Sequence, residues 1–132
     1  MIRQGVAYVA TLATYLGLDF LWLTLASGLY RAEIGGLMRP QPLIAVAAGF
    51  YALYALGVVV FAVRPGVSDQ GLIQTLGLGI LFGLVAYGTY DLTNLAAFQG
   101  YTVKIALIDW IWGSLLTGLC ALAGRLAISR LA

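Results

Sequence analysis

Long apolar runs separated by short polar segments dominate the chain. Four such runs extend from about residue 5 to 30, 43 to 63, 71 to 98 and 103 to 126. Because about 20 apolar residues in a helix cross the hydrocarbon core of a bilayer, each run is long enough to span it once. The pattern predicts an all-α integral membrane protein, a bundle of four transmembrane helices with both termini on the same side.

The segments between the runs carry residues that end or begin helices. Pro40 and Pro42 precede the second run, and proline is favoured at the start of a helix. Before the third run, Asp69 is either a solvated loop residue or, together with Ser68, an N-terminal helix signal. Residues 99–101 make a short turn. These connections leave no room for a soluble domain, so residues 1–132 are expected to form a single membrane domain.

Other readings of the pattern fit less well. A membrane β-barrel needs segments of about ten residues with alternating polar and apolar positions. A soluble helical bundle needs polar helix faces, but only 9% of the residues are charged and 62% are hydrophobic. The first run is also too long for a signal peptide and lacks a small-residue cleavage site, so it is expected to be a retained span.

The charges are few and scattered. The formal net charge of +2 arises from seven basic and five acidic residues that form no basic patch, which excludes nucleic acid as a partner. By the positive-inside rule the termini are expected in the cytoplasm, although the margin of four basic residues to three leaves dual topology open. The terminal side carries Arg3, Arg64, Arg125 and Arg130, and the other side carries Arg31, Arg39 and Lys104.

Several chemistries are missing from the chain. It contains no histidine, the commonest metal ligand and an axial ligand of haem. Its one cysteine, Cys120, cannot form an internal disulfide or a thiolate metal site and is expected to pack in the core. No metal, cofactor or catalytic residue is therefore predicted, and an enzymatic activity is disfavoured.

Three acidic residues interrupt the apolar runs: Asp19, Asp91 and Asp109. An ionised aspartate at the centre of a membrane helix costs about 2.5 to 3.5 kcal/mol on insertion scales. With a rise of about 1.5 Å per residue, all three lie at a similar depth, in the membrane half away from the termini. Asp91 and Asp109 should face each other across the turn at residues 99–101.

Aromatic and polar residues share helix faces with these acids, at spacings of three, four and seven residues. Two interpretations remain open. The polar groups could hydrogen-bond the carboxyl groups and hold the helices together, or the cluster could line a cavity for a proton, a cation or an amphipathic ligand. Two neighbouring carboxylates repel each other, so one is expected to hold a proton. The candidate residues are Asp19, Asp91, Asp109, Asn94, Tyr15, Trp22, Tyr51, Tyr54, Tyr87 and Trp112.

Other features have structural explanations. Tyr8, Tyr30 and Tyr101 lie near the ends of the runs and are expected to be interfacial anchors. Gly79 and Gly83 have the four-residue spacing of small residues that predicts a close contact between two membrane helices.

Three short motifs together resemble a family of small bacterial predicted membrane proteins that is catalogued as a domain of unknown function. They are Asp19–Trp22, Tyr90–Asn94 and Asp109–Gly113. The resemblance covers nearly the whole chain and implies a membrane fold but no established activity. Genes of such proteins often neighbour those for fatty-acid modification, a setting that implies a link to lipid metabolism.

Three functions therefore stay open for a protein of the bacterial inner membrane, whose first partner is the lipid bilayer. The acidic and aromatic cluster favours a ligand-binding, transport-like protein. Glycine- and alanine-rich helices suit an accessory subunit of a larger photosynthetic or respiratory complex, or a homo-oligomer. A membrane enzyme of lipid metabolism could use two carboxyl groups as acid and base, but the sequence offers no activated nucleophile.

Overall fold

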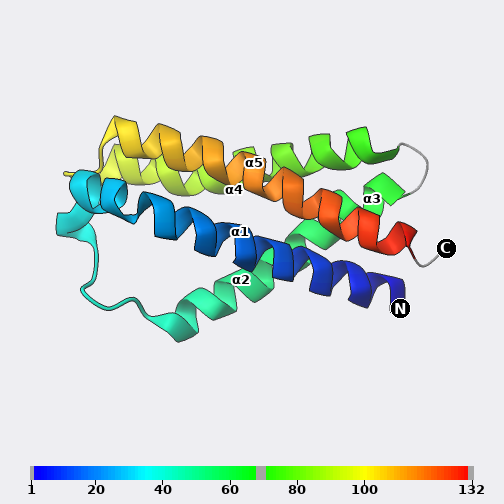
Figure 1. Ribbon diagram of the computed structural model, residues 1–132. Coiled ribbons are helices and arrows are strands. Elements are labelled where there is room, and N and C mark those ends of the chain that lie inside the picture. The colour runs from blue at the N-terminus through cyan, green and yellow to red at the C-terminus, as the bar shows by residue number, and fades with distance from the viewer. Residues whose placement is uncertain (1, 68–70, 131–132) are drawn as a thin grey trace.

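The computed structural model describes residues 2–67 and 71–130, and this part of the chain is helical without any strand (Figure 1). Four stretches are long and apolar enough to cross a membrane, which confirms the predicted fold class. The elements are α1 (Ile2–Ile34), the 3₁₀ turn η1 (Gly35–Leu37), α2 (Ile44–Val58), the π-helical turn η2 (Val59–Val63), α3 (Arg64–Val67), α4 (Gly71–Ala97) and α5 (Val103–Ser129).

Both ends of the chain lie at one end of the bundle. Figure 1 places the N- and C-termini together, while the connections from α1 to α2 and from α4 to α5 lie at the opposite end, called here the loop end. The helix signal predicted at Ser68 and Asp69 lies outside the described residues. Because α2, η2 and α3 follow one another without a break, they form the second span and its extension.

The first helix extends further than the charge pattern indicates. The first apolar run ends near residue 30, but Arg31 and Glu33 still belong to the last turn of α1, which ends at Ile34. The hydroxyl of Thr102 donates a hydrogen bond of 2.7 Å to the Glu33 carboxylate, and it also accepts one of 3.2 Å from the backbone N–H of Ile105 at the start of α5. This polar contact between α1 and the α4–α5 connection stabilises the extra helical turn.

Helix α5 is the central element of the bundle. Half of its most apolar stretch is buried inside the protein, against about a fifth for each of the other three spans. Helices α4 and α5 form a hairpin with very close backbones. A Cβ atom added at Gly79 would lie 2.8 Å from the Cα of Gly118, and one at Gly83 would lie 2.7 Å from the Cα of Ser114. The predicted close helix contact is confirmed.

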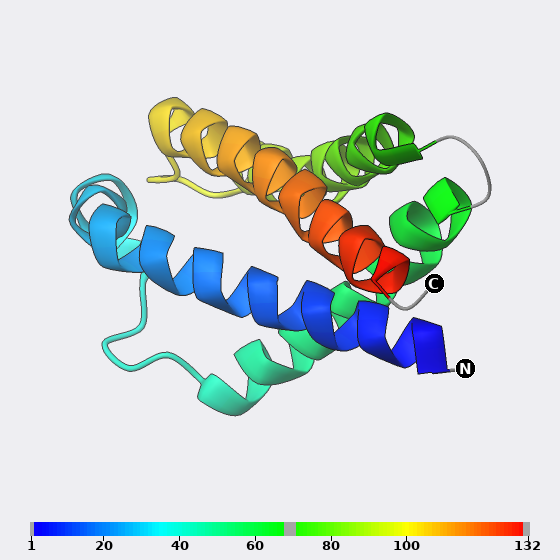
Figure 2. The same cartoon turned by 45° about the vertical axis from the view of Figure 1, so that its right-hand side comes forward.

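The two halves of α2 differ in their packing. In the half near the loop end, Ile44 and Leu53 are 70% and 67% exposed, and this half stands away from the other helices in Figure 2. Towards the terminal end, Val58 packs in the core with Cys120, which is buried as predicted. The second span therefore closes the bundle at the terminal end and leaves it open at the loop end.

The glycine contact leads to a stability prediction. Gly83→Ala should lower the free energy of unfolding by about 1–3 kcal/mol, because overpacking forces backbone shifts and the new Cβ would meet the backbone of α5. The matched control is Gly77→Ala on the same helix, where a Cβ atom meets nothing within 4 Å. Denaturation in detergent micelles, followed by circular dichroism, measures both variants. Equal stability of the two would contradict this packing.

Candidate functional site

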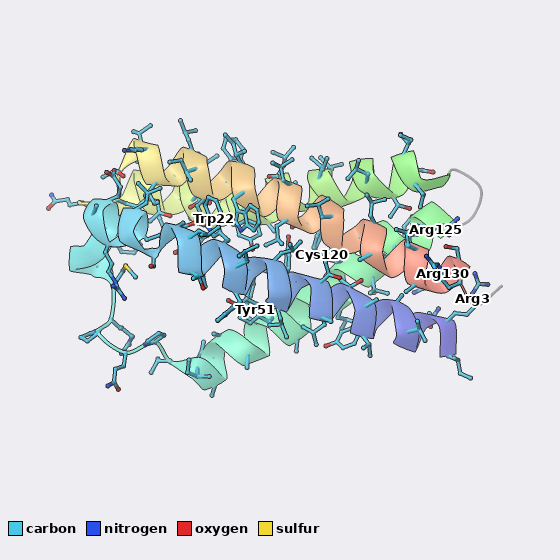
Figure 3. The ribbon with its side chains drawn as sticks, in the orientation of Figure 1. Arg3, Trp22, Tyr51, Cys120, Arg125 and Arg130 are labelled. Carbon is cyan, nitrogen blue, oxygen red and sulfur yellow. The ribbon has the colours of Figure 1, made fainter. Side chains whose placement is uncertain are left out.

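A cavity of about 320 Å³ lies between the four spans, in the half of the bundle near the loop end. It exists because α2 diverges from the other helices there. Seven of the ten predicted residues line it, and α1, α2, α4 and α5 each contribute at least one of them. These are Tyr15, Asp19, Trp22, Tyr51, Tyr87, Asp109 and Trp112. Figure 3 shows Trp22 between α1 and the α4–α5 hairpin, and Tyr51 between α1 and α2.

Asp19 of α1 is held by a tyrosine of α2. The hydroxyl of Tyr51 donates a hydrogen bond of 2.8 Å to Oδ2 of Asp19. Tyr15, four residues before Asp19 and on the same helix face, packs edge-to-face against Tyr51 with ring centroids 5.2 Å apart. The Tyr15 hydroxyl in turn shares a hydrogen bond with that of Tyr87 on α4. Asp19 is therefore the acidic end of a tyrosine cluster that joins three helices.

Asp109 of α5 ends a chain of donors that begins on α1. The indole N–H of Trp22 donates to the Tyr30 hydroxyl at 3.0 Å, and this hydroxyl donates to Oδ1 of Asp109 at 2.6 Å. The rings of Trp22 and Trp112 stack with centroids 4.6 Å apart and planes 10° from parallel. Because each hydrogen bond polarises the next, the two donors strengthen each other and fix the orientation of the Asp109 carboxyl group.

Asp91 of α4 does not line the cavity but lies behind it, fully buried. The hydroxyl of Tyr101 donates a hydrogen bond of 2.5 Å to its Oδ1. Its carboxyl group also interacts with that of Asp109 across the hairpin, as the spacing of the two acids predicted. The three acids therefore divide into the pair Asp91 and Asp109 and the separate Asp19.

Tyr8, Tyr30 and Tyr101, which were expected to be interfacial anchors, also form hydrogen bonds inside the protein. Tyr8 donates to the backbone oxygen of Ala52, Tyr30 to Asp109 and Tyr101 to Asp91. Tyr30 follows Asp19 by eleven residues, about three helical turns, so helical periodicity could have revealed it. Tyr101 lies in the α4–α5 connection, outside any helical period, and only the tertiary structure reveals its role.

The hydroxyl of Tyr101 stays protonated and can therefore always donate a hydrogen bond. Burial raises the pKa of its hydroxyl above the ordinary value of 10.0, and its hydrogen bond to the carboxylate of Asp91 raises this pKa further. The neutral hydroxyl is therefore retained throughout the physiological pH range, and it keeps donating to Asp91.

Two further predicted residues lie outside the cavity. Tyr54 is buried and shares a hydrogen bond of 2.7 Å with the Thr117 hydroxyl on α5. Asn94 lines a neighbouring groove of about 770 Å³ towards the loop end. The groove and the cavity share Ala47 and Tyr90 in their linings, so they form one path along the inner face of α2.

The path is mostly apolar, with charge at both ends. Arg39 lines the groove, whereas Asp19 and Asp109 line the cavity. Within residues 2–67 and 71–130, the acids do not form a group that could hold a metal ion. The chemistry of the site is that of carboxyl groups and aromatic faces, both of which attract cations.

This fold and site define a small four-helix membrane protein with an acidic, aromatic cavity between its spans. The chain belongs to the family described as "Predicted membrane protein (DUF2177)", whose family model matches residues 4–126. This match confirms the resemblance seen in the sequence motifs. No curated protein and no solved structure matches the chain.

The tyrosine donors lead to a second stability prediction. Tyr101→Phe should lower the free energy of unfolding by about 1–2 kcal/mol, because it removes a donor from a fully buried carboxyl group. Tyr8→Phe is the matched control, since its hydroxyl bonds a backbone oxygen in a more exposed place. It should cost less than about 0.5 kcal/mol. Denaturant titration in micelles compares the two, and similar losses would argue against a special role of the Asp91 contact.

Proposed function

We propose that this protein binds an amphipathic organic cation within the membrane and acts as a transport-like binding protein. One observation carries the proposal: two carboxyl groups, those of Asp19 and Asp109, line an aromatic cavity inside the bundle. A cation in an apolar medium needs an opposite charge close by, and aromatic faces add cation–π attraction.

The size and lining of the cavity support such a ligand. Its volume of about 320 Å³ lies within the range of roughly 300–1,000 Å³ that is typical of small-molecule pockets. Most of the lining is apolar or aromatic and would accept the hydrophobic part of the ligand. The aromatic side chains are those of Tyr15, Trp22, Tyr30, Phe50, Tyr51, Tyr87, Tyr90 and Trp112.

The groove beside the cavity supports a route for an amphipathic molecule. It continues the cavity along the exposed half of α2, where Ile44, Val46 and Phe50 would lie against lipid chains. A molecule dissolved in the bilayer could enter from the side without crossing a polar surface. The cationic group of the ligand is expected to rest in the acidic cavity, because Arg39 at the outer end of the groove is positively charged and repels it.

For the location we propose a bacterial inner membrane with cytoplasmic termini. Figure 3 shows Arg3, Arg125 and Arg130 at the end of the bundle where the chain begins and ends. Arg64 of α3 adds a fourth basic residue there, against three at the loop end. The positive-inside rule then favours cytoplasmic termini by a small margin.

Binding can be measured with benzyltrimethylammonium and its neutral isostere neopentylbenzene. Trp22 and Trp112 line the cavity, so a bound ligand should change the tryptophan fluorescence of the protein in nanodiscs. We expect the cation to bind at least about tenfold more tightly than the isostere. Asp109→Asn and Asp19→Asn should each weaken cation binding by about tenfold, equivalent to 1.4 kcal/mol, and leave the isostere unaffected.

Glu33→Gln is the matched control for these variants. It also removes one negative charge at the loop end, but Glu33 does not line the cavity. Its cation affinity should equal that of the unmodified protein. Equal affinities for cation and isostere would contradict the proposal, and stoichiometric co-purification with a larger assembly would then favour an accessory subunit.

Topology can be tested with fusions in a bacterial host. Green fluorescent protein joined after Ala132 should fluoresce, since it folds in the cytoplasm, whereas alkaline phosphatase joined after Gly100 should be active, since it folds outside the cytoplasm. The reverse pattern would overturn the proposed orientation. Activity of both reporters at both positions would indicate dual topology.

A further inference from the structure

We propose that Asp91 and Asp109 hold one proton between them, and that this proton is released when an organic cation binds beside Asp109. The shared proton follows from the burial and contacts of the two acids, whereas its release on cation binding rests on the proposed function above. Together they make the cavity a proton-exchange site.

The unpartnered oxygen of Asp91 is the first observation. Asp91 is fully buried, and Tyr101 satisfies its Oδ1. Its Oδ2 is also buried but has no hydrogen-bond partner among the described residues. A buried carboxylate oxygen without a donor is costly, so this position calls for a proton.

The position of Asp109 is the second observation. Its carboxyl group interacts with that of Asp91 across the α4–α5 hairpin. Two ionised carboxylates repel each other and can only accept hydrogen bonds, so one proton on the pair removes the repulsion and supplies the missing donor. The pair then carries one negative charge, and the unpartnered oxygen gains its missing bond, either as the donor or as the acceptor.

Hydroxyl groups from the surrounding elements support this state. Tyr30 of α1 donates to Asp109, and Tyr101 of the α4–α5 connection donates to Asp91. Tyr90 of α4 interacts electrostatically with both acids. These neutral donors stabilise the remaining negative charge of the pair, so a second proton is not needed.

Asp109 belongs to both the pair and the cavity, whereas Asp91 belongs to the pair only. A cation that binds beside Asp109 places a positive charge next to the shared proton and weakens its binding. The proton leaves to water, one positive charge replaces another, and the total charge of the site stays the same. Linkage makes the effect reciprocal, so protonation must weaken cation binding by the same factor.

Infrared difference spectroscopy tests for the shared proton without any ligand. At neutral pH the protein should show the C=O stretch of a protonated carboxyl group, and ¹³C-labelled aspartate should shift this band. Tyr101→Phe should change the band's frequency, because Tyr101 bonds Asp91 directly. Asp91→Asn should remove the band, and Asp19→Asn should leave it unchanged. Absence of the band from the unmodified protein would show that Asp91 and Asp109 share no proton, even if Asp91→Asn failed to fold.

Calorimetry tests the coupling. Titration with benzyltrimethylammonium in two buffers of different ionisation enthalpy should show the release of one proton per bound cation. The affinity should rise by about tenfold per pH unit while the pair is protonated. Cation binding without proton release would overturn the coupling but not the proposed function. An infrared band without cation binding would overturn the proposed function and the coupling, but the inference of a shared proton would stand.

Discussion

Three carboxyl groups must be accommodated in a membrane that offers no water, and the arrangement of the bundle depends on how this is achieved. Each acid receives a tyrosine hydroxyl from another part of the chain: Tyr51 bonds Asp19, Tyr30 bonds Asp109 and Tyr101 bonds Asp91. A hydroxyl solvates a carboxyl group without adding a second charge, and its ring remains compatible with the apolar interior. These bonds join α1 to α2, α1 to α5, and the α4–α5 connection to α4.

Small residues provide the frame on which these bonds are made. Gly79 and Gly83 bring the backbones of α4 and α5 so close that neither position has room for a Cβ atom. In a bilayer the lipid is as apolar as the side chains, so close packing of this kind largely replaces the hydrophobic effect as the reason for helix association. The hairpin then places Asp91 and Asp109 beside each other.

The cavity is the consequence of unequal packing along α2. Near the terminal end, Val58 and its neighbours in η2 are buried in the core, whereas Ile44 and Leu53 near the loop end are exposed. The acidic and aromatic side chains of α1, α4 and α5 therefore face a space that the second span does not fill. A polar interior with an opening towards lipid is suited to a ligand that is itself dissolved in the bilayer.

Much of the fold can be predicted from the sequence because its cause is local. Apolar runs of about 20 residues suffice to predict the four spans, and a four-residue glycine repeat is enough to predict a close contact at Gly79 and Gly83. The end of α1 could not be predicted in this way, because it depends on a bond from Thr102 to Glu33, which are distant in the sequence.

For the site, the sequence by itself determined which acids enter the membrane and at what depth, because charge in an apolar run and the helical rise are local properties. Only the tertiary structure decided how they group: Asp91 and Asp109 form a pair, Asp19 lies apart, and Asn94 and Tyr54 lie outside the cavity. It also showed that Tyr30 and Tyr101 donate hydrogen bonds to two of these acids. The physical reason is that a hydrogen-bond partner in a membrane is chosen by how helices rotate and diverge, and that depends on packing between distant segments.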